Sequence, residues 1–159
     1  MGGALLDVAQ VIAIVGAGLM AGLFFAFSVM VMPALRRQSV KRGMTVMQAI
    51  NATANTPLFG AVFLLPGVAC VVVAAGAVAD QEDPGAGLSL VGALAYRGGG
   101  IVLTFVYHVP RNNRLDKTSP AAEGAPDFWR TYLSEWTVMN HVRLALALIS
   151  TVTLYLGGS

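Results

Sequence analysis

The sequence predicts an all-α fold, a transmembrane four-helix bundle, from its composition, its apolar segments and the placement of its basic residues. Of its 159 residues, 56% are hydrophobic and only 11% are charged, and the mean hydropathy is +0.69. Soluble domains carry about 25% charged residues. The chain is therefore predicted to be a single integral membrane domain, residues 1–159, rather than a soluble protein.

Four apolar segments are long enough to cross a bilayer, which takes roughly 20 mostly apolar residues. The first is expected to be a span rather than a signal peptide, because it is long, carries Asp7 and has no basic residues before it. The third contains Arg97, and we expect it to end before Pro110, because a proline disfavours helical geometry at the preceding residue. The predicted spans cover residues 8–35, 57–79, 86–109 and 137–156.

The basic residues gather in two loops that four alternating spans place on the same side of the membrane. Loop one covers residues 36–56, and loop three, expected to be extended, covers residues 110–136. The positive-inside rule predicts that both loops are cytoplasmic and both termini are outside. Basic residues that flank a membrane favour contact with anionic lipid over nucleic acid. Eight of the ten Lys and Arg residues lie in these loops, namely Arg36, Arg37, Lys41, Arg42, Arg111, Arg114, Lys117 and Arg130.

Two further patterns concern helix packing. Loop one is predicted to contain a short amphipathic helix at the membrane interface. Its apolar residues recur every three positions and its amides every three or four, with Met44, Met47 and Ile50 in the first group and Gln48, Asn51 and Asn55 in the second. In the first span, Gly18 and Gly22 form a GxxxG pattern, which we interpret as packing within the bundle rather than dimerisation.

Polar residues are predicted to converge at the cytoplasmic end of the spans. Only 16 residues follow Arg143, too few to cross about 30 Å of hydrocarbon, so the fourth span must include Asn140, His141 and Arg143. Polar groups inside a membrane usually face the bundle interior and indicate function. Thr104 and His108 are expected at similar depth.

On an α-helix with 100° per residue, Arg97, Thr104 and His108 fall within about 40° of one another. Ser28 lies near the same end of span one. These groups predict a ligand site or active site, although they could instead hydrogen-bond to one another and lock the bundle.

Five short motifs follow one another along the chain: Phe27-Ser-Val-Met-Val-Met-Pro-Ala-Leu35, Met47-Gln-Ala-Ile-Asn51, Pro57-Leu-Phe59, Val109-Pro-Arg-Asn112 and Trp136-Thr-Val-Met-Asn140-His-Val-Arg143. Together they resemble the anthrone-oxygenase-like family of small four-span membrane proteins, over nearly the whole chain. The resemblance implies oxidation of anthrones to anthraquinones by O₂, without a metal or flavin. One departure is His108, where the family is expected to carry Asn more often, so His108 is a candidate specialisation.

This chemistry needs a base, a donor for an enolate oxygen and an apolar pocket open to O₂. A base that removes a proton from the anthrone CH₂ leaves a carbanion that can pass an electron to O₂. His141 is the predicted base, since histidine titrates near neutral pH. Arg143 and Asn140 are the predicted oxyanion stabilisers. The predicted substrate-binding residues are Ser28, Gln48, Asn51, Asn55, Thr104, His108, Asn112 and Trp136, with Phe24, Phe25 and Phe27 as further walls.

Two other functions stay open on the sequence alone. His108 and His141 could share a copper or haem iron in a redox or quinone-binding protein, with Met32, Met44 or Met47 as soft partners. The chain could also be a non-enzymatic accessory subunit that binds lipid, another copy of itself or a larger membrane complex.

Overall fold

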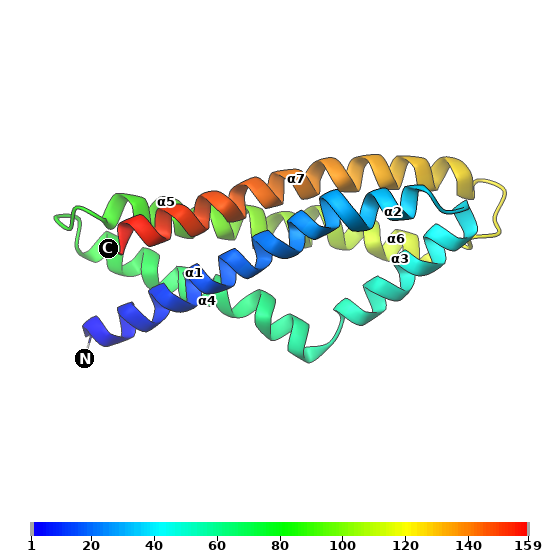
Figure 1. Cartoon of the computed structure of the whole chain (residues 1–159). Helices are drawn as coiled ribbons and strands as arrows, with labels where there is room; N and C mark the ends of the chain where they lie inside the picture. The colour runs from blue at the N-terminus through cyan, green and yellow to red at the C-terminus, as the bar shows by residue number, and fades with distance from the viewer. Residues whose placement is uncertain (1, 159) are drawn as a thin grey trace.

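The computed structural model describes residues 2–158, which form helices joined by short turns, with no strand in that range (Figure 1). Its elements, with η marking π-helical turns, are α1 (Gly2–Ala26), η1 (Phe27–Val31), α2 (Met32–Arg36), α3 (Val40–Ala54), α4 (Pro57–Ala79), α5 (Ala86–Ala95), η2 (Tyr96–Val102), η3 (Thr104–His108), α6 (Val109–Lys117) and α7 (Ala125–Gly157). They combine into four helical segments long and apolar enough to cross a membrane, Gly3–Arg36, Pro57–Ala79, Ala86–Lys117 and Ala125–Gly157. The predicted all-α four-helix membrane bundle is confirmed.

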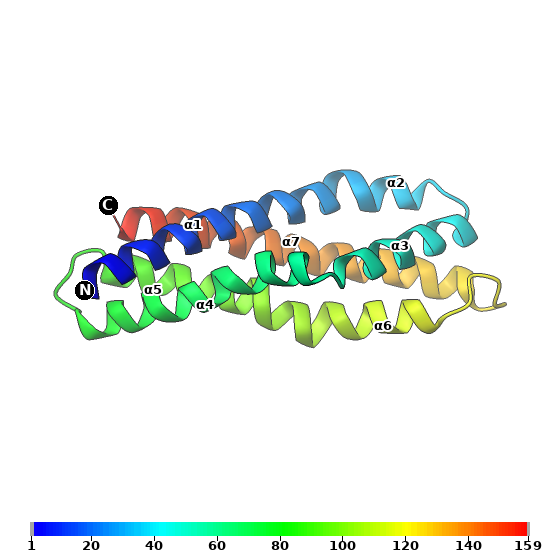
Figure 2. The ribbon, with the colours of Figure 1, turned by 90° about the horizontal axis from the view of Figure 1, so that it is seen from below.

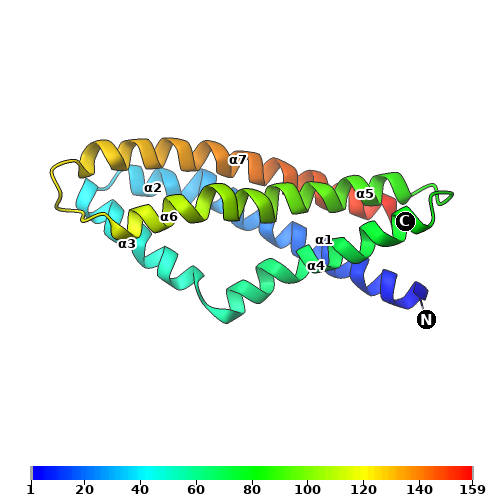
Figure 3. The same cartoon turned by 180° about the vertical axis from the view of Figure 1, so that it is seen from behind.

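The two ends of the bundle differ in charge. The chain termini and the turn between α4 and α5 lie at one end, and the turns from α2 to α3 and from α6 to α7 lie at the other (Figures 1 and 3). We call the second the basic end, because Arg36, Lys41, Arg114 and Lys117 lie there. The outer side of α1 is apolar, as expected of a lipid-facing helix, with Val11, Val15 and Leu19 each more than half exposed.

Two hydrophobic cores lie along the bundle. Helices α1, α4 and α5 lie toward the end of the chain termini and α2, α3 and α6 toward the other end, while α7 runs past both groups (Figure 2). The terminal core contains a stripe of small residues on α1, including Ala9, Ala13 and Ala17, and small side chains let membrane helices approach closely. The basic-end core is built from methionines and large aromatic residues, including Met44 and Trp129. The cavity described below is lined by residues of both cores.

Both loops of the basic end are more helical than the sequence suggests. The helix predicted in loop one is confirmed as α3, whose buried face includes Met44, Met47 and Asn51. Loop three is mostly helical as well, because α6 and the first turns of α7 leave only residues 118–124 outside helices. Leu115 and Trp129 are buried in the basic-end core, which stabilises these polar helices by apolar packing.

The third segment does not end before Pro110, contrary to the prediction, and runs as one rod from α5 to α6 (Figure 3). A proline removes one backbone donor and crowds the carbonyl four residues earlier. Here the turn before it is π-helical, with the Val109 N–H donating to the Thr104 carbonyl five residues back. Pro33 follows η1 in the same way, with the Met32 N–H donating to the Phe27 carbonyl. The wider turns therefore let both helices continue through a proline.

The π-helical turns also separate Arg97 from Thr104 and His108, which a regular α-helix would place on one face. In η2 and η3 each backbone hydrogen bond spans five residues rather than four. Each residue therefore turns the chain about the helix axis by a smaller angle than in an α-helix. His108 is buried, whereas Arg97 is exposed and donates a hydrogen bond of 3.3 Å from Nη1 to the Gly67 carbonyl. Arg97 therefore lies outside the functional site.

Gly16 lies at a tight contact between α1 and α4. A methyl group added at Gly16 would overlap the ring of Pro66, which lies inside α4. The GxxxG pair is less critical, because a methyl on Gly18 would meet Thr151 at an ordinary 3.7 Å and one on Gly22 would meet nothing within 4 Å. The contact at Gly16 is therefore tighter than those at the two glycines of the GxxxG pattern.

We therefore expect Gly16→Ala to destabilise the bundle by about 1–3 kcal/mol, the usual cost of overpacking. Gly22→Ala is the matched control and is expected to be neutral or slightly stabilising, since alanine is the better helix former. Unfolding of both variants in mixed detergent micelles measures the difference. Equal free energies of unfolding would contradict the assigned contact.

Candidate functional site

A cavity of about 260 Å³ lies between the two cores and receives side chains from all four helical segments and from α3. Ligand pockets usually span about 300–1,000 Å³, so this cavity suits a small ligand. Its walls include six large aromatic side chains, those of Phe24, Phe27, Phe59, Phe63, Phe105 and Trp136. Such walls favour a flat apolar molecule.

The edge of the cavity reaches two different surfaces. Leu64 on α4 and Phe105 on η3 line it and are 44% and 52% exposed on the outer side of the bundle. Asn113 and Asp116 line it near the basic end and are also exposed. The cavity therefore borders both an apolar and a polar surface.

Arg143 brings a positive charge into this cavity from α7. Its side chain is only 8% exposed, and no carboxylate pairs with it among residues 2–158. Its guanidinium carbon lies 3.9 Å from the ring centre of Phe24 and 5.9 Å from that of Trp136, and its Nε has no hydrogen-bond partner. Because burial of an unpaired charge is costly, this arrangement favours an anionic or electron-rich ligand.

His108 lies in the same cavity, at the end of η3, and is 1% exposed. Its ring lies edge-on to Trp136, with centroids 4.9 Å apart. The ring has an electrostatic contact with the backbone of Met139, but neither nitrogen has a partner at hydrogen-bonding geometry. Buried imidazoles normally find such partners. Both His108 nitrogens are also shielded from solvent, so they would reach a ligand only after the side chains around them shift.

Asn112 lies one helical turn after His108 and joins α6 to α7. Its Oδ1 accepts hydrogen bonds from Tyr132 Oη at 2.9 Å and from Trp136 Nε1 at 3.1 Å. Asn112 and Trp136 both line the cavity. Their hydrogen bond holds the indole between His108, Arg143 and the aromatic wall.

Helix α3 closes the basic end of the cavity through two amide contacts with α6. Asn51 Nδ2 donates to Asp116 Oδ1 at 3.0 Å. Gln48 Nε2 donates to the carbonyls of Leu115 and Thr118, at the end of α6, at 2.9 and 3.1 Å. Asn51 lines the cavity and Gln48 does not, so Gln48 holds α6 rather than a ligand.

Asn140 and Ser28 lie outside the cavity lining and connect α7 to the first segment. Asn140 Nδ2 donates to the Phe24 carbonyl and to Ser28 Oγ, both at 2.8 Å, in a fully buried position. These bonds fix α7 one turn before Arg143 and beside Phe24. The two residues therefore hold α7 against the first segment. This is the alternative that the sequence left open, in which polar groups hydrogen-bond to one another and lock the bundle.

His141 does not join this group. It is exposed on the outer side of α7 and does not line the cavity, because it lies about 200° around the helix from Arg143. Phe25 is likewise 54% exposed, on the outer side of α1. Asn55 and Thr104 do line the cavity, with Thr104 Oγ1 donating to the Gly100 carbonyl at 2.6 Å.

Several residues that line the cavity were not predicted from the sequence, above all Asp116. His108, Asn112 and Asp116 recur every four residues, a helical stripe, but the pattern was hidden by the expectation that the helix ends before Pro110. Phe59 and Phe63 form a similar pair at the start of α4. Their spacing would have indicated a shared face.

The structure was also searched for metal ligands. Within residues 2–158, no group of three or more His, Cys, Asp and Glu side chains is arranged to hold a metal ion. Of the pair suggested for copper or haem, His108 faces the cavity and His141 is exposed on the outside. Of the methionines suggested as soft ligands, Met47 lines the cavity, whereas Met32 and Met44 pack in the basic-end core.

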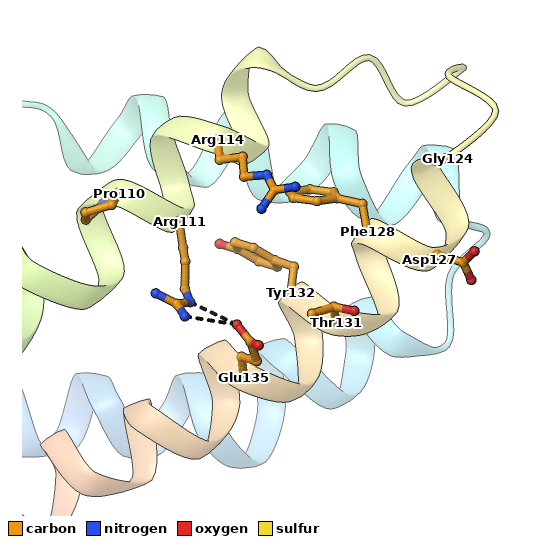
Figure 4. A pocket seen from close by; sticks show the side chains of 9 residues that line it. All are labelled: Pro110, Arg111, Arg114, Gly124, Asp127, Phe128, Thr131, Tyr132 and Glu135. Atoms are coloured by element: carbon orange, nitrogen blue, oxygen red, sulfur yellow. Dashed lines mark hydrogen bonds and ion pairs between the residues drawn. The ribbon is translucent and has the colours of Figure 1, made fainter.

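A second, larger hollow of about 560 Å³ lies between α6 and α7 and is lined mainly by exposed residues. Figure 4 shows Arg111 and Glu135 pointing toward each other across it, with an ion pair of 3.1 Å, while Asp127 points away. The Arg114 guanidinium lies over the ring of Phe128, 5.2 Å from its centre. Since these charges are paired or exposed to water, the smaller cavity is the better candidate site.

The fold and the cavity define a multi-pass helical membrane protein with an aromatic-walled site that holds an unpaired arginine. The family model for anthrone oxygenase matches residues 54–153, from the last residue of α3 into the final turns of α7. The chain therefore belongs to the anthrone oxygenase family. Searches of curated proteins and of solved structures find no match.

Proposed function

We propose that the chain is a membrane oxygenase that converts the CH₂ group of a flat, weakly acidic aromatic ketone of the anthrone type into a carbonyl with O₂. The observation that carries the proposal is the unpaired Arg143 beside the unpartnered His108 in one aromatic-walled cavity. A cation and a base side by side suit a reaction that passes through an enolate. Membership in the family supports the same reaction.

In this reaction His108 removes one proton from the CH₂ group, and Arg143 binds the enolate oxygen that forms. The enolate carbon gives one electron to O₂ and then combines with the resulting superoxide, and the proton from His108 completes a hydroperoxide. Loss of the remaining C–H proton with cleavage of the O–O bond releases water and leaves the new carbonyl. One anthrone and one O₂ yield one anthraquinone and one water, so the electrons balance without another reductant.

The proposal assigns the role of base to His108 rather than to His141. A base must come within hydrogen-bond reach of the proton that it removes. His108 lines the cavity, and His141 is exposed on the outer side of α7. Asn140, first considered as an oxyanion donor, acts in this proposal by fixing α7 against Phe24.

The site is proposed to be filled from the bilayer, in which both O₂ and apolar aromatics concentrate. The exposed Leu64 and Phe105 at the cavity edge support entry from the lipid side. We further propose that the basic end faces the cytoplasm and the termini face outside, as the charge asymmetry predicts. In this proposal the reaction proceeds without a metal or a flavin.

The experiment that tests this function is oxidation of anthrone by the detergent-purified protein under ¹⁸O₂. We expect a rate well above the autoxidation measured in the same micelles without protein. One ¹⁸O atom should enter each anthraquinone and the other should leave as water, with one O₂ consumed per anthrone. A rate equal to that of empty micelles, or unlabelled product from the enzymatic fraction, would refute the proposal.

A further inference from the structure

The orientation of the Asn112 amide follows from its two partners. An indole N–H can only donate a hydrogen bond, so the atom that Trp136 Nε1 contacts at 3.1 Å must be the amide oxygen. The Tyr132 hydroxyl, 2.9 Å from the same oxygen, must then donate as well. Both lone pairs of Oδ1 are used, and the NH₂ group points away from these partners.

The NH₂ group of Asn112 is left as a free donor. Among residues 2–158 no acceptor bonds to it. Unlike the His108 nitrogens, it is not fully shielded from solvent. Asn112 lines the cavity and does not line the larger hollow between α6 and α7. The two hydrogens are therefore free to bond to a ligand in the cavity or to water that such a ligand would displace.

Asn112 and Arg143 flank the same indole. Trp136 bonds to Asn112 and lies against the Arg143 guanidinium, 5.9 Å from its ring centre. A flat ligand beside Trp136 would thus meet two donors at different points of its edge. One is the cationic guanidinium of Arg143, and the other is the neutral NH₂ group of Asn112.

We propose that Asn112 is a substrate-binding residue that selects ligands by donating to a second acceptor oxygen, distinct from the oxygen held by Arg143. The proposal rests on the function proposed above. It narrows the substrate class to aromatic ketones that carry a further carbonyl or hydroxyl oxygen. It also implies that the quinone product, which has two carbonyls, binds to both donors.

The test is the binding of 9,10-anthraquinone, measured by quenching of tryptophan fluorescence in the detergent-purified protein. Asn112→Asp keeps an oxygen acceptor for Tyr132 and Trp136 but has no N–H. We expect it to lower the affinity at least about tenfold, as loss of one strong hydrogen bond does. Tyr132→Phe removes one bond to Oδ1 but leaves the NH₂ group and the bond from Trp136, so its affinity should fall much less than that of Asn112→Asp.

A purely structural role for Asn112 predicts the opposite order, with Asn112→Asp close to wild type and Tyr132→Phe weakened, and that order would overturn the proposal. So would the absence of anthraquinone binding by the wild-type protein. Wild-type binding of anthraquinone without oxidation of anthrone would refute the proposed function but would leave the role of Asn112 supported.

If Asn112→Asp does not fold, infrared spectra of anthraquinone bound to Arg143→Met provide the test. A carbonyl band at lower frequency than in empty micelles is expected, because the Asn112 donor remains. An unshifted band would overturn the proposal.

Discussion

Replacement of Arg143 by methionine is expected to lower kcat/KM for anthrone oxidation by about 10²–10³-fold, the usual loss when one oxyanion donor is removed. Methionine keeps much of the length and apolar character of the side chain but cannot bind an enolate oxygen. Arg97→Met is the matched control, since Arg97 is an exposed arginine on a neighbouring segment and does not line the cavity. The control should retain most of the activity.

The stability of Arg143→Met separates a functional from a structural role. If Arg143 mainly held the bundle together, its loss would destabilise the protein. Here the charge is buried without a carboxylate partner, against Phe24 and Trp136. Replacement of such a charge by an apolar side chain is often neutral or stabilising, so we expect an unchanged or higher melting temperature together with the lost activity. A destabilised but active variant would contradict the assignment.

Replacement of His108 by glutamine is expected to lower kcat by about 10²–10⁴-fold, the range for loss of a general base. Glutamine has a similar size and can form hydrogen bonds, but it cannot take up a proton. His141→Gln is the matched control and should change the rate by no more than about twofold, like other substitutions on an exposed surface.

Isotope exchange without O₂ isolates the step assigned to His108. In D₂O and in the absence of oxygen, the wild-type protein should exchange the CH₂ hydrogens of anthrone, and His108→Gln should not. If His141→Gln loses exchange instead, the base lies on the outer side of α7 and the assignment to His108 is wrong. If both variants exchange at the wild-type rate, histidine is not the base.

Most of the fold follows from composition and spacing. The four segments are visible because each holds a long apolar run, and α4 covers the predicted residues 57–79. Within α7, Trp136, Asn140 and Arg143 recur at intervals of four and three, and all three are buried. The same rule would have placed His141 on the opposite face.

The rest could not be predicted because it depends on tertiary contacts and on irregular turns. A π-helical turn has no clear sequence pattern, so Arg97 and His108 could not be assigned to different faces. Nor could the continuation of a helix through Pro110 be inferred from local rules. The roles of Gln48 and Asn140 depend on partners 67 or more positions away in sequence, which periodicity does not reveal.

The π-helical turn η3 also determines what the loss of one residue would do to the third segment. Such a turn holds one residue more than an α-helical turn, so a deletion inside η3 would leave a regular turn and keep the later side chains of α6 in place. Asn112 would still line the cavity, and Leu115 would stay buried in the basic-end core. The cost would fall on Pro110, whose ring would crowd the carbonyl four residues before it. The extra residue of η3 is thus tied to the proline that follows it rather than to the side chains of the cavity.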